Sequence, residues 1–261
     1  MEKTLKEQEN DILKRFEKIY KSKISCDGLH FLGEIFIENG YWDRREGNEE
    51  EQWHNICAKK RGLVVITKEL NDPDNPWDIR IETARKNFIE EPTPTNILFY
   101  KNLRNWVYCL LHIDGRGNTP DCPGLEVAQE CFENSPMVRI NIKKSPGGGT
   151  IKYDSMSKIY EDKKLHGLIK EQLSLYKDAS IYLDCTRKWG IAYLTELYPD
   201  LQSFGEGDDE WVYYSDENRF IVINGYHPSY RRLNGDYGDE YYINMQKAIK
   251  CFFHARPDFF K

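Results

Sequence analysis

The sequence lacks long hydrophobic runs, and this absence removes membrane proteins from consideration. No apolar stretch approaches the roughly 20 residues that a membrane-spanning helix needs. Residues 1–20 contain no apolar core of the kind found in a signal peptide. We therefore expect a cytoplasmic protein with no membrane partner.

Paired metal-ligand spacing is also missing. The seven cysteines are odd in number and none of them forms a C-x-x-C pair, the spacing common in zinc and iron–sulfur sites. In a cytoplasmic chain such thiols are more often buried than joined in disulfides. We expect no bound metal.

What is present is an ordinary globular composition. The chain has 261 residues, of which 39% are hydrophobic and 31% charged, and it shows no internal repeat or low-complexity tract. This length suits one large α/β domain. We expect a monomer with a single domain over residues 1–261, in which residues 1–58 form an N-terminal helical extension. Apolar residues at helical spacing predict an amphipathic helix over residues 2–22.

The formal net charge is −6, whereas nucleic-acid-binding proteins usually carry a basic surface. Basic side chains nevertheless cluster locally, so a local binding surface remains open. The clusters are Lys59-Lys60-Arg61, Lys143-Lys144, Arg187-Lys188 and Arg231-Arg232.

Four short apolar segments, rich in β-branched residues, predict strands that are buried on both faces of a parallel sheet. Helical stretches are predicted between and after them, at 96–112, 124–133, 155–177, 188–197 and 239–254. This alternation predicts an α/β fold: a three-layer α/β/α sandwich with a mostly parallel four-stranded central sheet. The four segments are 62–67, Met137–Ile142, Ala179–Asp184 and Phe220–Asn224.

In such sheets, ligands bind at the carboxyl ends of the strands. The residues that follow the four segments are polar there, and they offer a carboxylate, amides, a histidine and several cations. A purely structural strand end more often carries turn residues alone. We therefore expect the functional site at this edge.

Three of these segments resemble the uracil-DNA glycosylase superfamily. VINGYHPSYR (222–231) resembles the His-Pro-Ser motif after the last strand, and LVVITKELN (63–71) resembles the first motif. Between them, RINIKKSPGGG (139–149) resembles the strand that ends in a base-reading Asn. The order along the chain agrees with the family. The first motif departs from it, because the best-known enzymes have Gly at the position of Thr67 and Pro at that of Leu70.

The resemblance implies a DNA glycosylase, which cleaves the bond between the sugar C1′ and the base through an oxocarbenium-like transition state. Glu69 would act as the catalytic carboxylate that positions water, and His227 would donate a hydrogen bond to the departing base while neutral. The alternative roles are a surface carboxylate at a turn for Glu69 and a packed loop histidine for His227.

The family pattern also suggests how the base and the DNA are held. Asn141 would read the base with its amide, Asn71 at the same site would help hold the water or the sugar phosphate, and Trp77 would be the aromatic floor, with Phe88 as the other candidate. The structural alternative is a turn at the strand end for Asn141 and the core for the two aromatic residues. The expected DNA-binding residues are Lys143, Lys144, Ser229, Tyr230 and Arg231. Tyr230 or Leu233 would enter the DNA and fill the gap that the flipped nucleotide leaves.

We therefore predict a monofunctional DNA glycosylase that needs no cofactor and has DNA as its partner, with uracil as the default base. Two alternatives remain open. The pocket could take a modified base of phage DNA, as in anti-phage defence, or the chain could be a non-catalytic nucleic-acid- or nucleotide-binding module on the same fold.

Overall fold

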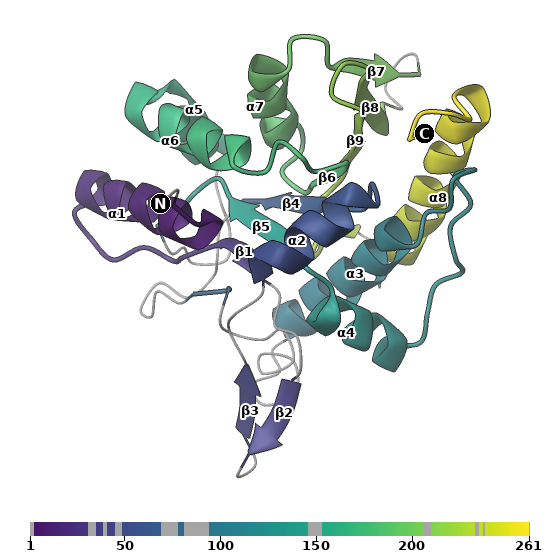
Figure 1. The fold of residues 1–261 in the computed structure, drawn as a ribbon, viewed down its shortest axis with the longest axis horizontal. Helices are drawn as coiled ribbons and strands as arrows, with labels where there is room; N and C mark the ends of the chain where they lie inside the picture. Colours follow the sequence, from purple (N-terminus) through teal and green to yellow (C-terminus); the bar gives the residue numbers. More distant parts are fainter. Residues whose placement is uncertain are drawn as a thin grey trace.

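A computed structural model describes residues 3–30, 35–38, 41–44, 49–68, 78–80, 94–145, 153–205, 210–232, 235–236 and 238–260. The described residues form eight helices and a seven-stranded mixed sheet (Figure 1). The helices are α1 (Leu5–Tyr20), α2 (Glu49–Ala58), α3 (Pro94–Leu111), α4 (Leu125–Asn134), α5 (Tyr153–Glu161), α6 (Lys163–Ser174), α7 (Trp189–Leu197) and α8 (Gly238–Ala255).

The sheet has the strand order β1-β5-β4-β6-β9-β8-β7. Its strands are β1 (Gly28–His30), β4 (Leu63–Thr67), β5 (Met137–Asn141), β6 (Ile181–Asp184), β7 (Gln202–Phe204), β8 (Val212–Ser215) and β9 (Phe220–Asn224). Strands β5, β4, β6 and β9 are mutually parallel, and β1, β8 and β7 pair antiparallel with their neighbours. Two separate pairs complete the list: β2 (Ile35–Glu38) with β3 (Tyr41–Arg44), and β10 (Arg231–Arg232) with β11 (Gly235–Asp236).

The α/β class is confirmed, but the expected size of the sheet is wrong. The four predicted strands form its parallel centre, because continuous apolar runs such as β4 are buried on both faces. The three additional strands extend its edges. Each has only three or four residues, too few for a clear periodicity.

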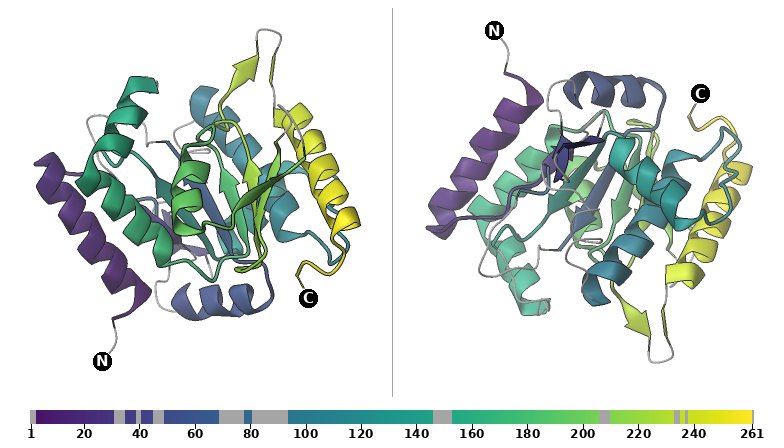
Figure 2. Two further views of the ribbon diagram at one scale, coloured as in Figure 1. Left: turned by 90° about the horizontal axis from the view of Figure 1, so that it is seen from above. Right: turned by 90° about the horizontal axis from the view of Figure 1, so that it is seen from below.

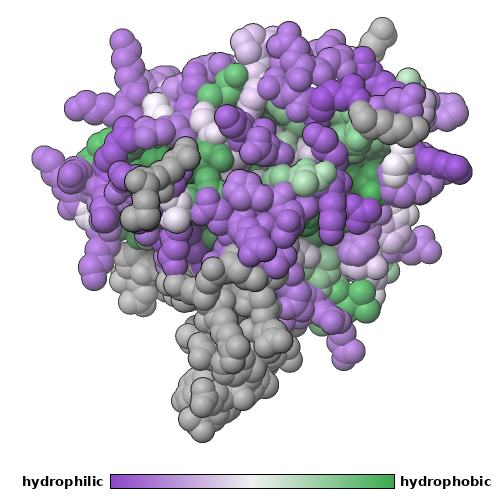
Figure 3. All heavy atoms as spheres, viewed as in Figure 1, coloured by the Kyte–Doolittle hydropathy of each residue, from purple (hydrophilic) through white to green (hydrophobic). Residues whose placement is uncertain are grey.

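Helices cover both faces of the sheet (Figure 2). One apolar cluster joins Val64, Ile66 and Val138 to side chains of α1, α2, α5, α6 and α7. The other joins Leu63, Val65 and Leu183 to side chains of α3, α4 and α8. The face shown in Figure 3 is mainly hydrophilic, with small hydrophobic areas between polar residues.

Two expectations about the elements need correction. The N-terminal 58 residues are not purely helical, because β1 joins the central sheet beside β5. The single helix expected over 155–177 is two helices, α5 and α6. Asp162 separates them: its carboxylate caps α6 by accepting hydrogen bonds from the backbone N–H groups of Lys164 and Leu165.

Candidate functional site

The carboxyl ends of the four parallel strands meet at one edge of the sheet. Thr67 of β4 lies opposite Asn141 of β5, and Asp184 of β6 lies opposite Asn224 of β9. The predicted polar strand ends therefore share one edge, as the parallel topology requires. Their side chains differ, however, in whether they face a ligand or the protein interior.

Asn141 faces the interior and is only 1% exposed. Its amide oxygen accepts a hydrogen bond from Thr67 Oγ1 at 2.5 Å, and its amide nitrogen donates to Asp27 Oδ2 at 3.0 Å. The backbone N–H of Asn141 donates to the same carboxylate oxygen at 2.8 Å. Both ends of the amide are thus engaged within the protein, which disagrees with the base-reading role expected from the sequence.

Lys144 also differs from its expected role as a DNA-contacting cation. Its side chain is fully buried, and its ammonium group donates to both carboxylate oxygens of Asp27, at 2.7 and 2.8 Å. Gln172 of α6 donates to that carboxylate as well, at 2.9 Å. Burial lowers the pKa of Lys144, while Asp27 opposes this shift. Lys144 therefore holds the strand ends together and does not reach a phosphate.

His227 is the predicted site residue whose geometry is best suited to catalysis. Its Nδ1 lies 2.7 Å from Ser229 Oγ and also accepts the backbone N–H of Ser229 at 3.3 Å. Because a backbone N–H can only donate, Nδ1 is the acceptor of the neutral ring and the proton lies on Nε2. Among the described residues, Nε2 has no hydrogen-bond partner, so this N–H is available to a ligand.

The surroundings of His227 keep the imidazole neutral. Burial, and to a smaller extent the positive charges of Lys68 and Arg139, lower its pKa to about 4. Asn102 of α3 fixes the loop by donating a 2.7 Å hydrogen bond to the carbonyl of Pro228. The site therefore presents a neutral N–H donor beside two cations.

Sequence reasoning missed Phe99 and Arg139. The ring of Phe99 lies 5.3 Å from the imidazole of His227, and the guanidinium of Arg139 lies 5.7 Å from the centre of the Phe99 ring. Arg139 is 3% exposed, and within the described part of the chain neither its Nε nor its Nη2 has a hydrogen-bond partner. The sequence signal that could have identified Arg139 is a cation inside the apolar run MVRIN. A charged side chain is rarely buried in a protein unless it is paired or has a functional role.

The remaining predicted residues are placed as follows. Ser229 orients His227, and Tyr230 is 37% exposed with its ring stacked on Tyr226 at 4.9 Å. Arg231 pairs through its backbone with Asp236 in β10–β11, and Lys143 is half-buried. Glu69, Asn71 and Trp77 lie outside the described residues, as do Phe88 and Leu233.

Asp184 is a buried carboxylate at the same edge, and its role is structural. It accepts hydrogen bonds from the backbone N–H groups of Thr186 and Ile191, and from the Thr186 hydroxyl. Burial raises its pKa, although these hydrogen bonds oppose the shift. It thereby fixes the turn in which Arg187 and Lys188 both have left-handed backbones, with φ of 61° and 78°.

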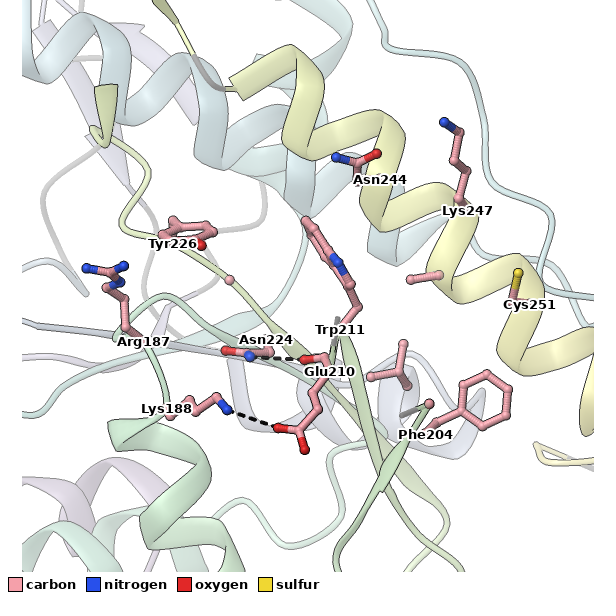
Figure 4. A pocket seen from close by; sticks show the side chains of 14 residues that line it. Arg187, Lys188, Phe204, Glu210, Trp211, Asn224, Tyr226, Asn244, Lys247 and Cys251 are labelled. Carbon is pink, nitrogen blue, oxygen red and sulfur yellow. Dashed lines mark hydrogen bonds and ion pairs between the residues drawn. The ribbon is translucent and has the colours of Figure 1, made fainter. Parts of the chain in front are cut away.

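A cavity of about 750 Å³ opens next to this turn (Figure 4). Its walls come from the β6–α7 turn, the end of β7, the start of β8, the end of β9 and helix α8. The side chains that matter most are Arg187, Lys188, Glu210, Trp211, Tyr226, Asn244 and Lys247. Tyr226 of the cavity wall is followed directly in the chain by His227.

The basic clusters do not all converge on this edge. Arg187-Lys188 lines the cavity, whereas Lys59-Lys60-Arg61 precedes β4 and lies at the opposite edge of the sheet. Within the described part of the chain, no group of three or more His, Cys, Asp or Glu side chains is arranged to hold a metal ion. No helix in that part is long and apolar enough to cross a membrane.

Comparisons with known proteins add no assignment: no protein-family model, curated protein or solved structure matches this chain.

Proposed function

We propose that the protein is a DNA glycosylase that hydrolyses the N-glycosidic bond of a base extruded from DNA, with uracil as the default base. The observation that carries this proposal is the state of His227. A neutral imidazole offers Nε2–H at the carboxyl edge of the sheet, beside the positive charges of Lys68 and Arg139.

This arrangement suits a departing anion. When the bond from C1′ to the base breaks, its electron pair moves onto the base, and negative charge develops on the carbonyl oxygens. A fixed N–H donor and nearby cations stabilise that charge more than they stabilise the neutral base. Water then adds to C1′ and loses a proton. Glu69, which follows Lys68 in the sequence, is the carboxylate that we assign to this step.

A second candidate is a base other than uracil, such as a modified base. The specific reason is that the Asn141 amide is engaged by Thr67 and Asp27, while Arg139 stands near His227. An amide matches an edge with alternating acceptor and donor atoms, but a guanidinium has donors only. A pocket that uses Arg139 would favour a base whose edge presents acceptors alone.

The test is base release from labelled single- and double-stranded oligonucleotides. The panel contains uracil, mismatched thymine, hypoxanthine, and hydroxymethylated and glucosylated cytosine. We expect alkali-labile sites with at least one base, a rate lower by about 10²–10³ in His227→Ala, and no product with Glu69→Gln.

His54→Ala is the matched control. His54 is an exposed histidine of α2, the helix that precedes β4, and so it lies away from the carboxyl ends of the strands. Its rate should equal that of the wild type. If folded protein releases no base from any substrate, the glycosylase proposal fails and the non-catalytic binding module takes its place.

A further inference from the structure

The cavity at the β6–α7 turn combines flat aromatic rings with positive charge. The guanidinium of Arg187 lies 5.1 Å from the ring centre of Tyr226. On the same ring, Tyr230 stacks with an angle of 20° between the planes. The Trp211 ring lies 5.1 Å from Tyr241, which holds it in place. Arg187 and Tyr230 both lie against the Tyr226 ring, whereas the Trp211 ring lines the cavity as the kind of flat aromatic surface on which nucleic-acid bases stack.

The charges around the cavity differ in how far they are already neutralised. Lys188 pairs with Glu210 at 2.9 Å, and the Tyr213 hydroxyl also donates to that carboxylate. Arg187 and Lys247 are exposed and make no ion pair with any other described residue. Two cations are thus available to an anionic group on a ligand, although the chain as a whole carries a charge of −6.

The backbone of the turn is a further, independent observation. A left-handed backbone is uncommon for a residue other than glycine, and here Arg187 and Lys188 adopt it in succession. Such conformations cluster at ligand sites, where surrounding structure enforces them. The buried Asp184 and Thr186 supply that enforcement through their hydrogen bonds. The backbones of Arg187 and Lys188 are thereby fixed at the rim of the cavity.

We propose that this cavity binds a nucleoside phosphate, with its base on the face of Trp211 and its phosphate on one of the two cations, Arg187 or Lys247, that stand at opposite ends of the cavity (Figure 4). The volume of about 750 Å³ lies within the usual range for small-molecule sites. Because Tyr226 of the cavity wall directly precedes His227 in the chain, we assign to the cavity the nucleotide next to the extruded one in a single DNA strand. This inference extends the proposed function but does not require base release.

The experiment measures binding without catalysis. Fluorescein-labelled deoxythymidine oligonucleotides of ten residues are titrated with wild-type protein at several salt concentrations, and unlabelled thymidine 5′-monophosphate serves as the free nucleotide. We expect Arg187→Ala and Lys247→Ala each to weaken oligonucleotide binding about five- to tenfold and to reduce the salt slope by about one phosphate contact. Trp211→Leu should weaken binding without changing that slope, because it removes stacking and leaves the charges.

Lys59→Ala is the matched control, because it removes an exposed cation at the opposite edge of the sheet. It should bind like the wild type. Competition by the monophosphate, lost in Arg187→Ala, would identify a free-nucleotide site, whereas binding of the oligonucleotide alone would identify a strand subsite. Both outcomes support the proposal. It is overturned if Arg187→Ala and Lys247→Ala, folded as judged by circular dichroism, bind as tightly as Lys59→Ala.

The two proposals fail in different ways. Arg187-dependent binding without base release from any substrate would remove the glycosylase and leave the nucleotide site. Base release from single strands that is equal in Arg187→Ala and wild type, at substrate concentrations below KM, would do the reverse.

Discussion

At the scale of single residues, His227 shows how the environment sets chemistry. Its burial and two nearby cations all disfavour the imidazolium form. Two hydrogen bonds to Nδ1 then decide which nitrogen carries the proton. A residue that the sequence marks only by the tripeptide His-Pro-Ser thus becomes a neutral donor with a defined direction.

We predict that the His227 ring titrates with a midpoint of about 4. Below pH 6.5 the unfolded chain binds a proton at this site and the folded protein does not, so stability is lost as pH falls from about 6.5 to about 4. The ring proton signals in NMR spectra, assigned by their loss in His227→Gln, measure the midpoint directly. A midpoint above 6 would contradict both the geometry and the proposed role.

The left-handed Arg187 allows a second prediction. A left-handed backbone costs a non-glycine residue about 1–2 kcal/mol, and a glycine at this position avoids that cost. Glycine also has more conformational entropy in the unfolded chain, which reduces the gain in stability by about 0.5–1 kcal/mol. We therefore expect Arg187→Gly to have a higher free energy of unfolding than Arg187→Ala, by up to about 1 kcal/mol.

Urea denaturation of both variants measures this difference. Lys59 also lies in a turn but is absent from the left-handed residues, so Lys59→Gly should be less stable than Lys59→Ala. If the variant with alanine at position 187 is as stable as the variant with glycine, the turn does not have a left-handed backbone at Arg187 and stores no strain there.

At the scale of elements, a buried ion pair connects the start of β1, the end of β5 and helix α6. The Asp27 carboxylate accepts from Lys144, Asn141 and Gln172, and none of these four side chains is more than 1% exposed. Removing one charge of such a pair leaves the other buried and uncompensated, at a cost of about 3–5 kcal/mol. The carboxyl edge therefore depends on this network for its geometry.

We predict that Lys144→Met lowers the free energy of unfolding by about 3–5 kcal/mol, because it leaves the Asp27 charge without its partner. The neighbouring Lys143, which is only half-buried, supplies the control Lys143→Met, with an effect below about 1 kcal/mol. Adding Asp27→Asn to Lys144→Met should recover part of the loss. Denaturant midpoints test all three variants. Equal midpoints for Lys144→Met and Lys143→Met would show that the ion pair between Asp27 and Lys144 does not stabilise the fold.

The same edge shows what the sequence could and could not predict. Strands β4 and β9 were predictable because burial on both faces leaves a continuous apolar run. Edge strands such as β7 carry too few residues for a pattern. Local sequence likewise cannot show that Asn141 is occupied, because its partner Asp27 lies 114 residues away in the chain.

At the scale of the whole molecule, Glu9 joins the N-terminal helix to the rest of the protein. Its carboxylate accepts from the backbone N–H of Leu29 in β1 and from the Tyr176 hydroxyl, and it lies 3.6 Å from Arg80. A Cβ at Gly28 would lie 1.7 Å from Glu9 Oε1, and Gly28 has φ of 142°, so this junction also requires glycine. The docking of α1 therefore depends on a buried acid.

Burial raises the pKa of Glu9 to about 7, although Tyr176 and Arg80 oppose the shift. Between pH 4.5 and 7 the folded protein holds a proton here that the unfolded chain has released, so stability from this group falls as pH rises through that window. The change amounts to about 3 kcal/mol and is complete above pH 7. His227 acts in the opposite direction over part of the same range, so the contribution of Glu9 is visible only as a difference between variants.

We predict that Glu9→Gln gains stability relative to the wild type as pH rises from 5 to 8, by about 3 kcal/mol, because glutamine has no proton to lose. Denaturation midpoints across this range measure the gain. Glu17→Gln, at an exposed position of the same helix, is the control and should follow the wild-type curve. If the stability curves of Glu9→Gln and Glu17→Gln are parallel at every pH, Glu9 is ionised throughout this range. The N-terminal helix then docks through an ordinary ion pair with Arg80 rather than through a protonated acid.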